Sequence, residues 1–166
     1  SLCIDPTTIN FRRCIDISDR SLRHINYALK SGQAKLDIKT GFEITAASEI
    51  MSILTLSSDL SDMRKRLGNI VVALSKDAKC VTASDIKADG MAAAVLKEAL
   101  KPNLVQTSEG TPCLIHTGPF ANVSIGSSSI IADKIALGLS DYVVTESGFG
   151  ADCGADTLIK QIGFHK

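Results

Sequence analysis

The sequence contains no tryptophan, and aromatic residues make up only 4% of its 166 residues. Such a low content argues against a protein that stacks single-stranded nucleic acid on aromatic side chains. Basic and acidic residues number 18 each, so the formal net charge is zero. A balanced chain is not typical of a nucleic-acid binder held by phosphate contacts or of a polybasic membrane binder. We therefore expect neither nucleic acid nor membrane as a partner.

Long apolar runs and targeting signals are also missing. The longest apolar run, Met91 to Leu96, is far shorter than a membrane span. The first residues, Ser1-Leu2-Cys3-Ile4-Asp5-Pro6, lack the charged and apolar regions of a secretory signal. We expect an internal segment of a cytoplasmic protein, with a mitochondrial location as the alternative.

The five cysteines stand far apart, with no close pair: Cys3, Cys14, Cys80, Cys113 and Cys153. Their spacing matches neither a zinc site nor a dense disulfide framework. An odd number of cysteines in an ordinary composition indicates reduced thiols. We expect them to be small buried side chains and predict no metal site.

The composition and the changing hydrophobic period predict an α/β protein. Hydrophobic residues make up 45% of the chain, which is enough for a core. Caps and helical periodicity predict helices at 18–29, 46–57, 60–67, 91–100, 128–139 and from 156 onward. Short apolar runs predict strands at 41–45, 70–74, 104–107, 113–116 and 142–145, with a polar loop at 33–40.

Charge is distributed unevenly along the chain. Residues 1–83 hold 12 basic and 9 acidic residues, whereas residues 84–166 hold 6 and 9. The N-terminal half could therefore face an anionic partner. A solvated helix face is the simpler interpretation.

Two strand-loop-helix units in the last third are the most informative feature. Strand 113–116 leads into loop 117–127, and strand 142–145 leads into loop 146–154. Parallel strands joined by right-handed crossovers would place both loops at the carboxyl edge of one sheet, where ligands bind. Alternatively, the glycines of these loops only make tight turns.

Neither loop matches a specific nucleotide motif. The spacing Gly148-x-Gly150-x-x-x-Gly154 is one residue too long for the dinucleotide fingerprint. The sequence contains no Gly-Lys-Ser/Thr phosphate loop. No nucleophile and base can be paired from spacing, so we predict no catalytic residue within the chain.

Several side chains in or beside the loops are candidate ligand contacts. Phe120 lies in a polar Gly-Pro loop, where it could form a platform for a flat ligand or fold back into the core. His116 could act as an acid or base, although a structural histidine is the simpler interpretation. Glu146 and Asp152 could hold a cation or orient an amine, and Asp152 could equally cap a helix.

Longer motifs resemble formate–tetrahydrofolate ligase across essentially the whole chain. The most specific are Lys101-Pro102-Asn103-Leu104-Val105-Gln106-Thr107, Gly118-Pro119-Phe120-Ala121-Asn122 and the run from Tyr142 to Asp152. Earlier blocks, at 16–23, 41–49 and 67–72, agree in order and spacing.

The resemblance implies a fold and an activity. The fold would be a three-layer α/β ligase of the P-loop NTPase type, with a mostly parallel sheet flanked by helices. Residues 1–102 would belong to a helix-rich second domain and residues 103–166 to the large nucleotide-binding domain. The substrates would be formate, ATP and tetrahydrofolate, joined through formyl phosphate to give 10-formyltetrahydrofolate. ATP and Mg²⁺ would be held mainly by other parts of a homo-oligomeric parent enzyme, so we expect this segment alone to be inactive.

The resemblance also implies a folate contact. Phe120 resembles the aromatic residue that packs against the pterin, with Gly118, Pro119 and Asn122 shaping its loop. Further loop contacts would come from His116, Glu146, Gly148, Gly150 and Asp152. The sequence departs from the family pattern where Thr117 replaces a glycine, Ile125 a histidine and Ser128 an asparagine, and Ile38-Lys39 an Arg-Glu pair. These departures leave open a catalytically inactive relative that serves as a structural or assembly module.

Overall fold

The computed structural model describes residues 2–16, 19–31, 34–121 and 128–148. Its α-helices are α1 (Glu49–Leu56), α2 (Leu60–Gly68), α3 (Asp89–Leu96) and α4 (Ile130–Leu139). Its strands are β1 (Arg13–Cys14), β2 (Ile25–Ser31), β3 (Ala34–Thr40), β4 (Phe42–Glu43), β5 (Val71–Leu74), β6 (Cys80–Thr82), β7 (Asn103–Gln106) and β8 (Pro112–Ile115). Short 3-10 helices are η1 (Pro6–Thr8), η2 (Arg20–Arg23) and η3 (Thr45–Ala47). The predicted α/β composition is confirmed.

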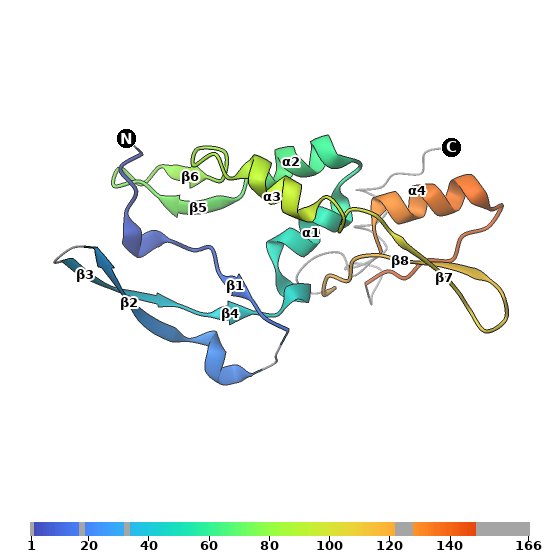
Figure 1. Ribbon diagram of the computed structural model, residues 1–166, viewed down its shortest axis with the longest axis horizontal. Helices are drawn as coiled ribbons and strands as arrows, with labels where there is room; N and C mark the ends of the chain where they lie inside the picture. Colours follow the sequence, from blue (N-terminus) through green and yellow to red (C-terminus); the bar gives the residue numbers. More distant parts are fainter. Residues whose placement is uncertain (1, 17–18, 32–33, 122–127, 149–166) are drawn as a thin grey trace.

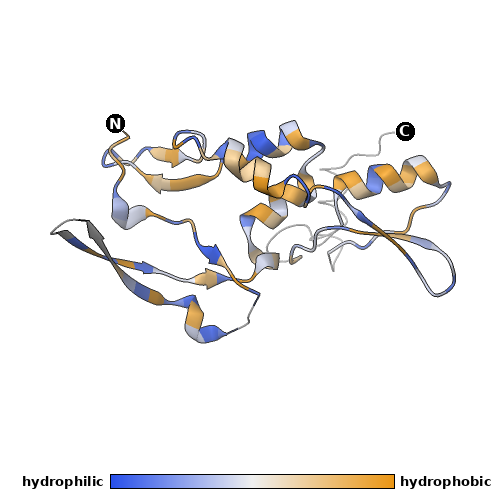
Figure 2. Cartoon of the chain, viewed as in Figure 1, coloured by the Kyte–Doolittle hydropathy of each residue, from blue (hydrophilic) through white to orange (hydrophobic). Residues whose placement is uncertain are grey.

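The described part of the molecule is elongated. Figure 1 places the β2–β3 hairpin at one end, helices α1 to α3 in the middle, and α4 with β7 and β8 at the other end. The core lies in the middle part, where α1, α2 and α3 pack beside the β5–β6 pair. Met63 and Leu67 of α2 are almost completely buried there. Figure 2 shows apolar residues on α1 and α3 and hydrophilic residues on the outer side of α2.

Side-chain caps define where three of the helices begin. Ser48 accepts the Met51 N–H at 3.1 Å, Asp59 accepts the Asp62 N–H at 2.9 Å, and Ser129 accepts the Ala132 N–H at 3.0 Å. These bonds satisfy N–H groups that have no partner inside the helix. Helices α1, α2 and α4 accordingly form close to the positions predicted from sequence.

The predicted helix at 18–29 and the predicted loop at 33–40 are wrong. Strands β2 and β3 form an antiparallel hairpin in which Ile25 pairs with Thr40 and Tyr27 with Ile38. Apolar and polar residues alternate along both segments, and this two-residue period outweighs the cap signal. Asp19 does act as a cap, but only for η2, where it accepts the Ser21 N–H at 2.8 Å.

The prediction of a mostly parallel sheet is also wrong for the described residues. Only β1 and β4 pair in parallel, whereas the pairs β2–β3, β5–β6 and β7–β8 are antiparallel. Strands β7 and β8 form a hairpin because the turn before Thr111 includes Gly110 at a φ of +86°. A hairpin brings consecutive strands together directly, so no crossover separates them.

The predicted strand at 142–145 does not form. Tyr142 is 91% exposed and Val144 is 99% exposed, and neither pairs with another described strand. The two loops that follow residues 116 and 145 are therefore not placed at one sheet edge by neighbouring parallel strands. The predicted helix from 156 lies outside the described residues.

Two other expectations concern exposure and membranes. Cys3, Cys14, Cys80 and Cys113 are exposed, so the prediction of buried thiols is wrong for these four, and Cys153 lies outside the described residues. Among the described helices, none has the length and apolar character needed to span a membrane.

Candidate functional site

A short loop after β8 presents Phe120 to solvent. The Phe120 N–H donates to the carbonyl of Ala46 at 3.1 Å, and the Gly118 N–H points to Sδ of Met51 at 3.3 Å. Pro119 is buried, whereas Phe120 remains 44% exposed. The loop is thus attached to η3 and α1 by its backbone, and its aromatic ring is left available for contact.

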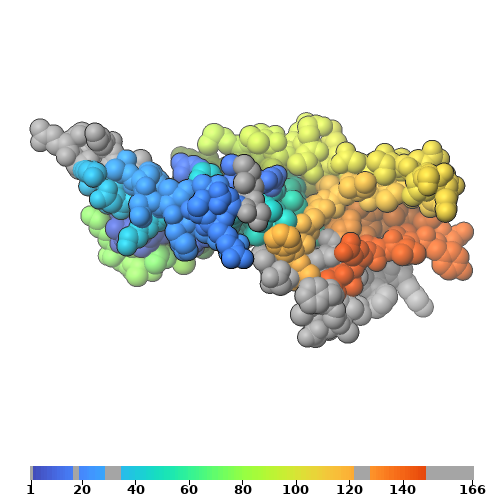
Figure 3. Space-filling view, turned by 90° about the horizontal axis from the view of Figure 1, so that it is seen from below, coloured from blue at the N-terminus to red at the C-terminus, as the bar shows by residue number. Residues whose placement is uncertain are grey.

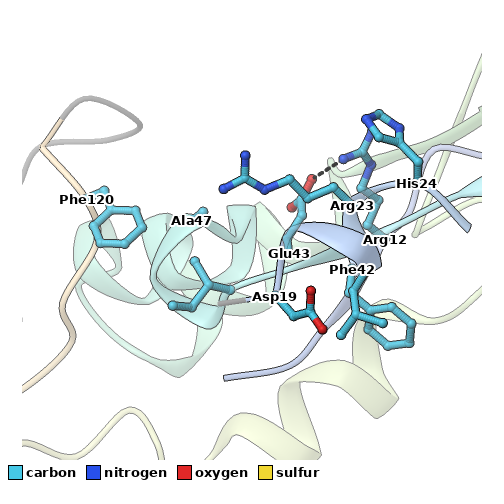
Figure 4. Close-up of a pocket in the computed structure, with 10 residues that line it drawn as sticks. Arg12, Asp19, Arg23, His24, Phe42, Glu43, Ala47 and Phe120 are labelled. Carbon is cyan, nitrogen blue, oxygen red and sulfur yellow. Dashed lines mark ion pairs between the residues drawn. The ribbon is translucent and has the colours of Figure 1, made fainter. Parts of the chain in front are cut away.

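The Phe120 ring forms one wall of a pocket of about 500 Å³. The other lining residues belong to η2, β4, η3 and the residues beside them: Arg12, Asp19, Leu22, Arg23, His24, Phe42, Glu43, Ile44 and Ala47. Figure 4 shows Phe120 at one end of this set and Phe42 near the other. The volume falls within the roughly 300–1,000 Å³ range of small-molecule sites. The pocket therefore lies between the loop and the N-terminal segment, and not between two β-to-α crossovers as predicted.

The N-terminal segment reaches this place through the parallel β1–β4 pair. Arg13 pairs with Phe42 and Cys14 with Glu43, and the Ile15 N–H donates to the Glu43 carbonyl at 2.9 Å. Figure 3 shows the blue N-terminal segment and the light-orange segment near residue 120 on the same face of the molecule. Two parts of the chain that are distant in sequence thus line one cavity.

Gly41 allows the close approach that brings η2 to the pocket. A Cβ atom at this position would lie 2.0 Å from the carbonyl oxygen of Arg23, which is far inside van der Waals contact. Gly41 is buried, and it directly precedes Phe42 and Glu43 of β4. Only a residue without a side chain fits between β4 and η2 there.

The pocket contains both positive and negative groups. Arg12 Nη1 lies 3.5 Å from Glu43 Oε1, so these two charges are paired (Figure 4). The backbone N–H of Ser21 donates to the Asp19 carboxylate and lowers the pKa of Asp19, which keeps this group ionised. Arg23 forms no ion pair with any other described residue.

His116 lies beneath the loop and is only 7% exposed. Its Nε2 lies 2.8 Å from the Ala99 carbonyl oxygen, and its Nδ1 lies 2.5 Å from Oγ of Ser129. A carbonyl can only accept, so Nε2 carries the proton and Nδ1 accepts from the Ser129 hydroxyl. Both ring nitrogens are therefore satisfied, which is the structural role that the sequence favoured.

Thr117 lies between His116 and Gly118 in an unfavourable conformation. Its φ is +50°, which is rare for a β-branched residue, and its buried Oγ1 has no hydrogen-bond partner among the described residues. Glycine adopts this φ without strain. The glycine that the resemblance implies at this position would therefore fit the backbone better than Thr117 does.

The other predicted contacts do not join this pocket. Glu146 is exposed and Gly148 is buried, and neither lines it. Asn122, Gly150 and Asp152 lie outside the described residues. Four residues that line the pocket were not predicted as site residues: Arg12, Arg23, Phe42 and Glu43. The concentration of positive charge before residue 40 and the block at 41–49 were the signals that could have found them.

Within the described residues, no group of three or more His, Cys, Asp and Glu side chains could hold a metal ion. The part of the chain that the structure describes therefore offers no cluster of ligands for Mg²⁺.

The fold and the pocket together describe an α/β protein with a pocket lined by aromatic and by oppositely charged side chains. A family model described as formate–tetrahydrofolate ligase matches residues 1–162. The formate–tetrahydrofolate ligase of Thermosipho africanus is 55% identical over 161 residues, which are 95% of this chain and 29% of the relative. The enzymes of that name from Pseudothermotoga lettingae and Saccharopolyspora erythraea are 56% and 51% identical over 155 residues, or 93% of this chain.

The chain belongs to the formate–tetrahydrofolate ligase family, as its motifs predicted. It spans 27–29% of the length of the curated relatives it matches.

Proposed function

We propose that this chain is a segment of an ATP-dependent ligase that joins formate to tetrahydrofolate and releases 10-formyltetrahydrofolate. The family match over residues 1–162 carries the proposal. The position of Phe120, partly exposed in a pocket of about 500 Å³, agrees with a contact to a flat pterin ring.

The proposed reaction has two steps. Formate attacks the γ-phosphate of ATP, giving formyl phosphate and ADP. The N10 amine of tetrahydrofolate then attacks the formyl carbon, and phosphate leaves. Both steps move negative charge, which positively charged groups and Mg²⁺ stabilise when bound.

The role proposed for this segment is to position the folate. Phe120 stacks against the pteridine, and Gly118, Pro119 and Asn122 shape the loop that carries it. His116 supports that loop from below through its bonds to Ala99 and Ser129. The sequence holds no phosphate loop, so we assign ATP and formyl phosphate to other parts of a longer parent chain.

The longer parent protein that would contain this segment has a proposed fold, oligomeric state and location. Its fold would be the three-layer, P-loop NTPase-like architecture, with a boundary near Pro102 between a second domain and the nucleotide-binding domain. The parent would be a homo-oligomer acting on formate, ATP and tetrahydrofolate in the cytoplasm, or alternatively in mitochondria.

A segment exchange tests the proposal. In the Thermosipho africanus ligase, this chain replaces the matching segment, which it resembles at 55% identity. We expect the chimaera to form 10-formyltetrahydrofolate from formate, ATP and tetrahydrofolate, and the isolated chain to form none. A folded but inactive chimaera would contradict the proposal.

The second candidate is a catalytically inactive relative with a structural or assembly role. The strained Thr117 in place of the family's glycine, and Ile125 in place of its histidine, favour this alternative. Activity that appears only after Thr117→Gly and Ile125→His in the chimaera would support it.

A further inference from the structure

Arg23 is the pocket cation with no partner of opposite charge among the described residues. The Arg12 guanidinium is already beside Glu43, at 3.5 Å. In Figure 4 the Arg23 side chain extends away from that pair toward the Phe120 side of the pocket. An arginine presents a planar set of N–H donors that fits the two oxygens of a carboxylate.

The backbone holds Arg23 at this place. Asp19 caps η2 through the Ser21 N–H, and Gly41 lies directly against the Arg23 carbonyl. Arg23 is therefore the last residue of a short helix that is fixed at its start by a cap and at its end by β4. Less backbone freedom is lost when the side chain of such a residue binds a ligand.

Neither acidic group of the pocket, Asp19 or Glu43, forms an ion pair with the Arg23 guanidinium. Glu43 is paired with Arg12, and Asp19 accepts the hydrogen bond from the Ser21 N–H at 2.8 Å. Figure 4 shows the Asp19 carboxylate and the Arg23 guanidinium on different sides of the pocket. An anion beside Arg23 would thus meet an available donor group.

We propose that Arg23 binds a carboxylate of the glutamyl tail of the folate whose pteridine ring lies on Phe120. This inference rests on the proposed function. The pteridine ring of tetrahydrofolate is uncharged, and its carboxylates all lie at the glutamyl end. Phe120 and Arg23 come from opposite walls of one pocket, so the ring and the tail of a single ligand can contact both. Arg23 then distinguishes folates with a tail from simple pterins.

Binding measurements on the chimaera of this chain with the Thermosipho africanus ligase test this with three probes. These are 6-methyltetrahydropterin, which has no tail, tetrahydrofolate, and tetrahydrofolate extended by two γ-linked glutamates. By isothermal titration calorimetry we expect Arg23→Gln to weaken binding of both tailed folates about tenfold, as for a lost charge-assisted hydrogen bond. Binding of 6-methyltetrahydropterin should stay within about twofold. Phe120→Ala should weaken the binding of all three probes.

Arg20→Gln is the matched control, because Arg20 is exposed on the same η2 helix and does not line the pocket. It should leave all three affinities unchanged. Equal weakening of tailed and tail-free probes by Arg23→Gln, or no weakening, overturns the proposal. Inorganic phosphate that competes with 6-methyltetrahydropterin in an Arg23-dependent manner would instead indicate a phosphate site and also overturns it.

The chimaera with the Thermosipho africanus ligase separates the two proposals. There, Arg23→Gln should raise the KM for tetrahydrofolate about tenfold and leave kcat within about twofold. An active chimaera whose KM does not respond to Arg23→Gln rejects the role of Arg23 alone. An inactive chimaera that also fails to bind any of the three probes rejects the folate assignment itself.

Discussion

His116 and Ser129 are joined through Nδ1 and Oγ at 2.5 Å, and this bond connects the end of β8 to the first turn of α4. The same Ser129 hydroxyl oxygen accepts the Ala132 N–H at 3.0 Å and so caps α4. The other ring nitrogen reaches the Ala99 carbonyl at 2.8 Å. One buried pair therefore holds three parts of the chain together directly beneath the Phe120 loop.

Replacing Ser129 should destabilise the chain. Ser129→Ala removes a helix cap, worth about 1 kcal/mol, and leaves a buried ring nitrogen without its partner, at about 1–3 kcal/mol. We expect the free energy of unfolding, measured with urea, to fall by about 2–4 kcal/mol. Ser140→Ala is the control, because Ser140 is exposed at the other end of α4. Equal effects of the two substitutions would contradict a special role for the His116–Ser129 bond.

Thr117→Gly should stabilise the chain. The positive φ of Thr117 costs about 1–3 kcal/mol, and glycine removes this strain. Glycine also raises the conformational entropy of the unfolded chain, which offsets part of the stabilisation. We expect a net increase of about 1 kcal/mol in the free energy of unfolding. Thr117→Ala removes the orphaned hydroxyl but keeps a Cβ at the same φ, so the two variants separate the hydroxyl from the backbone contribution. A lower stability for Thr117→Gly than for Thr117→Ala would refute the strain.

Gly41→Ala should disturb both stability and the pocket. Its Cβ would collide with the Arg23 carbonyl at 2.0 Å, so β4 and η2 must separate. We expect a loss of about 2 kcal/mol or more in the free energy of unfolding, as for overpacking, together with weaker tetrahydrofolate binding. The control is Gly138→Ala on α4, where a Cβ meets nothing within 4 Å. That substitution should stabilise the helix by about 0.5–1 kcal/mol, and similar losses at both glycines would contradict the steric explanation.

The Arg64–Asp89 pair should make stability depend on pH. The hydrogen bond from Arg64 Nε, at 2.8 Å, lowers the pKa of Asp89 below 3.8 and ties α2 to α3. A lowered folded-state pKa means that the unfolded chain binds the proton more readily, so this contribution is present at neutral pH and is lost as the pH falls through the lowered pKa. Asp89→Asn should therefore reduce stability at about pH 7 and have a smaller effect at about pH 2.5.

The urea midpoints of wild type and Asp89→Asn at several pH values measure this effect. Arg64→Gln is the control, because it removes the donor and should make Asp89→Asn less costly at neutral pH. An Asp89→Asn effect of the same size in both backgrounds and at all pH values would show that the pair is not responsible.

Local signals in the sequence were sufficient to predict the helices of the middle and C-terminal parts. Ser48, Asp59 and Ser129 are caps followed by helical periodicity, and such interactions involve neighbours within one turn. The β2–β3 hairpin was missed because the cap at Asp19 was extended into a helix, although residues 25–31 alternate with a strand period.

Only part of the site could be predicted, because the rest of it depends on contacts between residues distant in the sequence. Phe120 is recognisable locally, since an aromatic residue in a Gly-Pro loop has no obvious role in the core. Arg12 and Arg23 share a pocket with Phe120 through the β1–β4 pair, the close approach of Gly41 to Arg23 and the loop bond to Ala46. These contacts join residues distant in the chain. No periodicity within either segment contains that information.

The single backbone bond from Phe120 to Ala46 has a consequence for ligand-linked stability. A molecule held between Phe120 and Arg23 would contact the loop that this bond attaches to η3 and would oppose the loss of the bond. The stabilisation would grow with the logarithm of its concentration relative to its dissociation constant. Tetrahydrofolate should consequently slow hydrogen–deuterium exchange at the Phe120 amide, and protection should extend across β4 to the amide of Ile15.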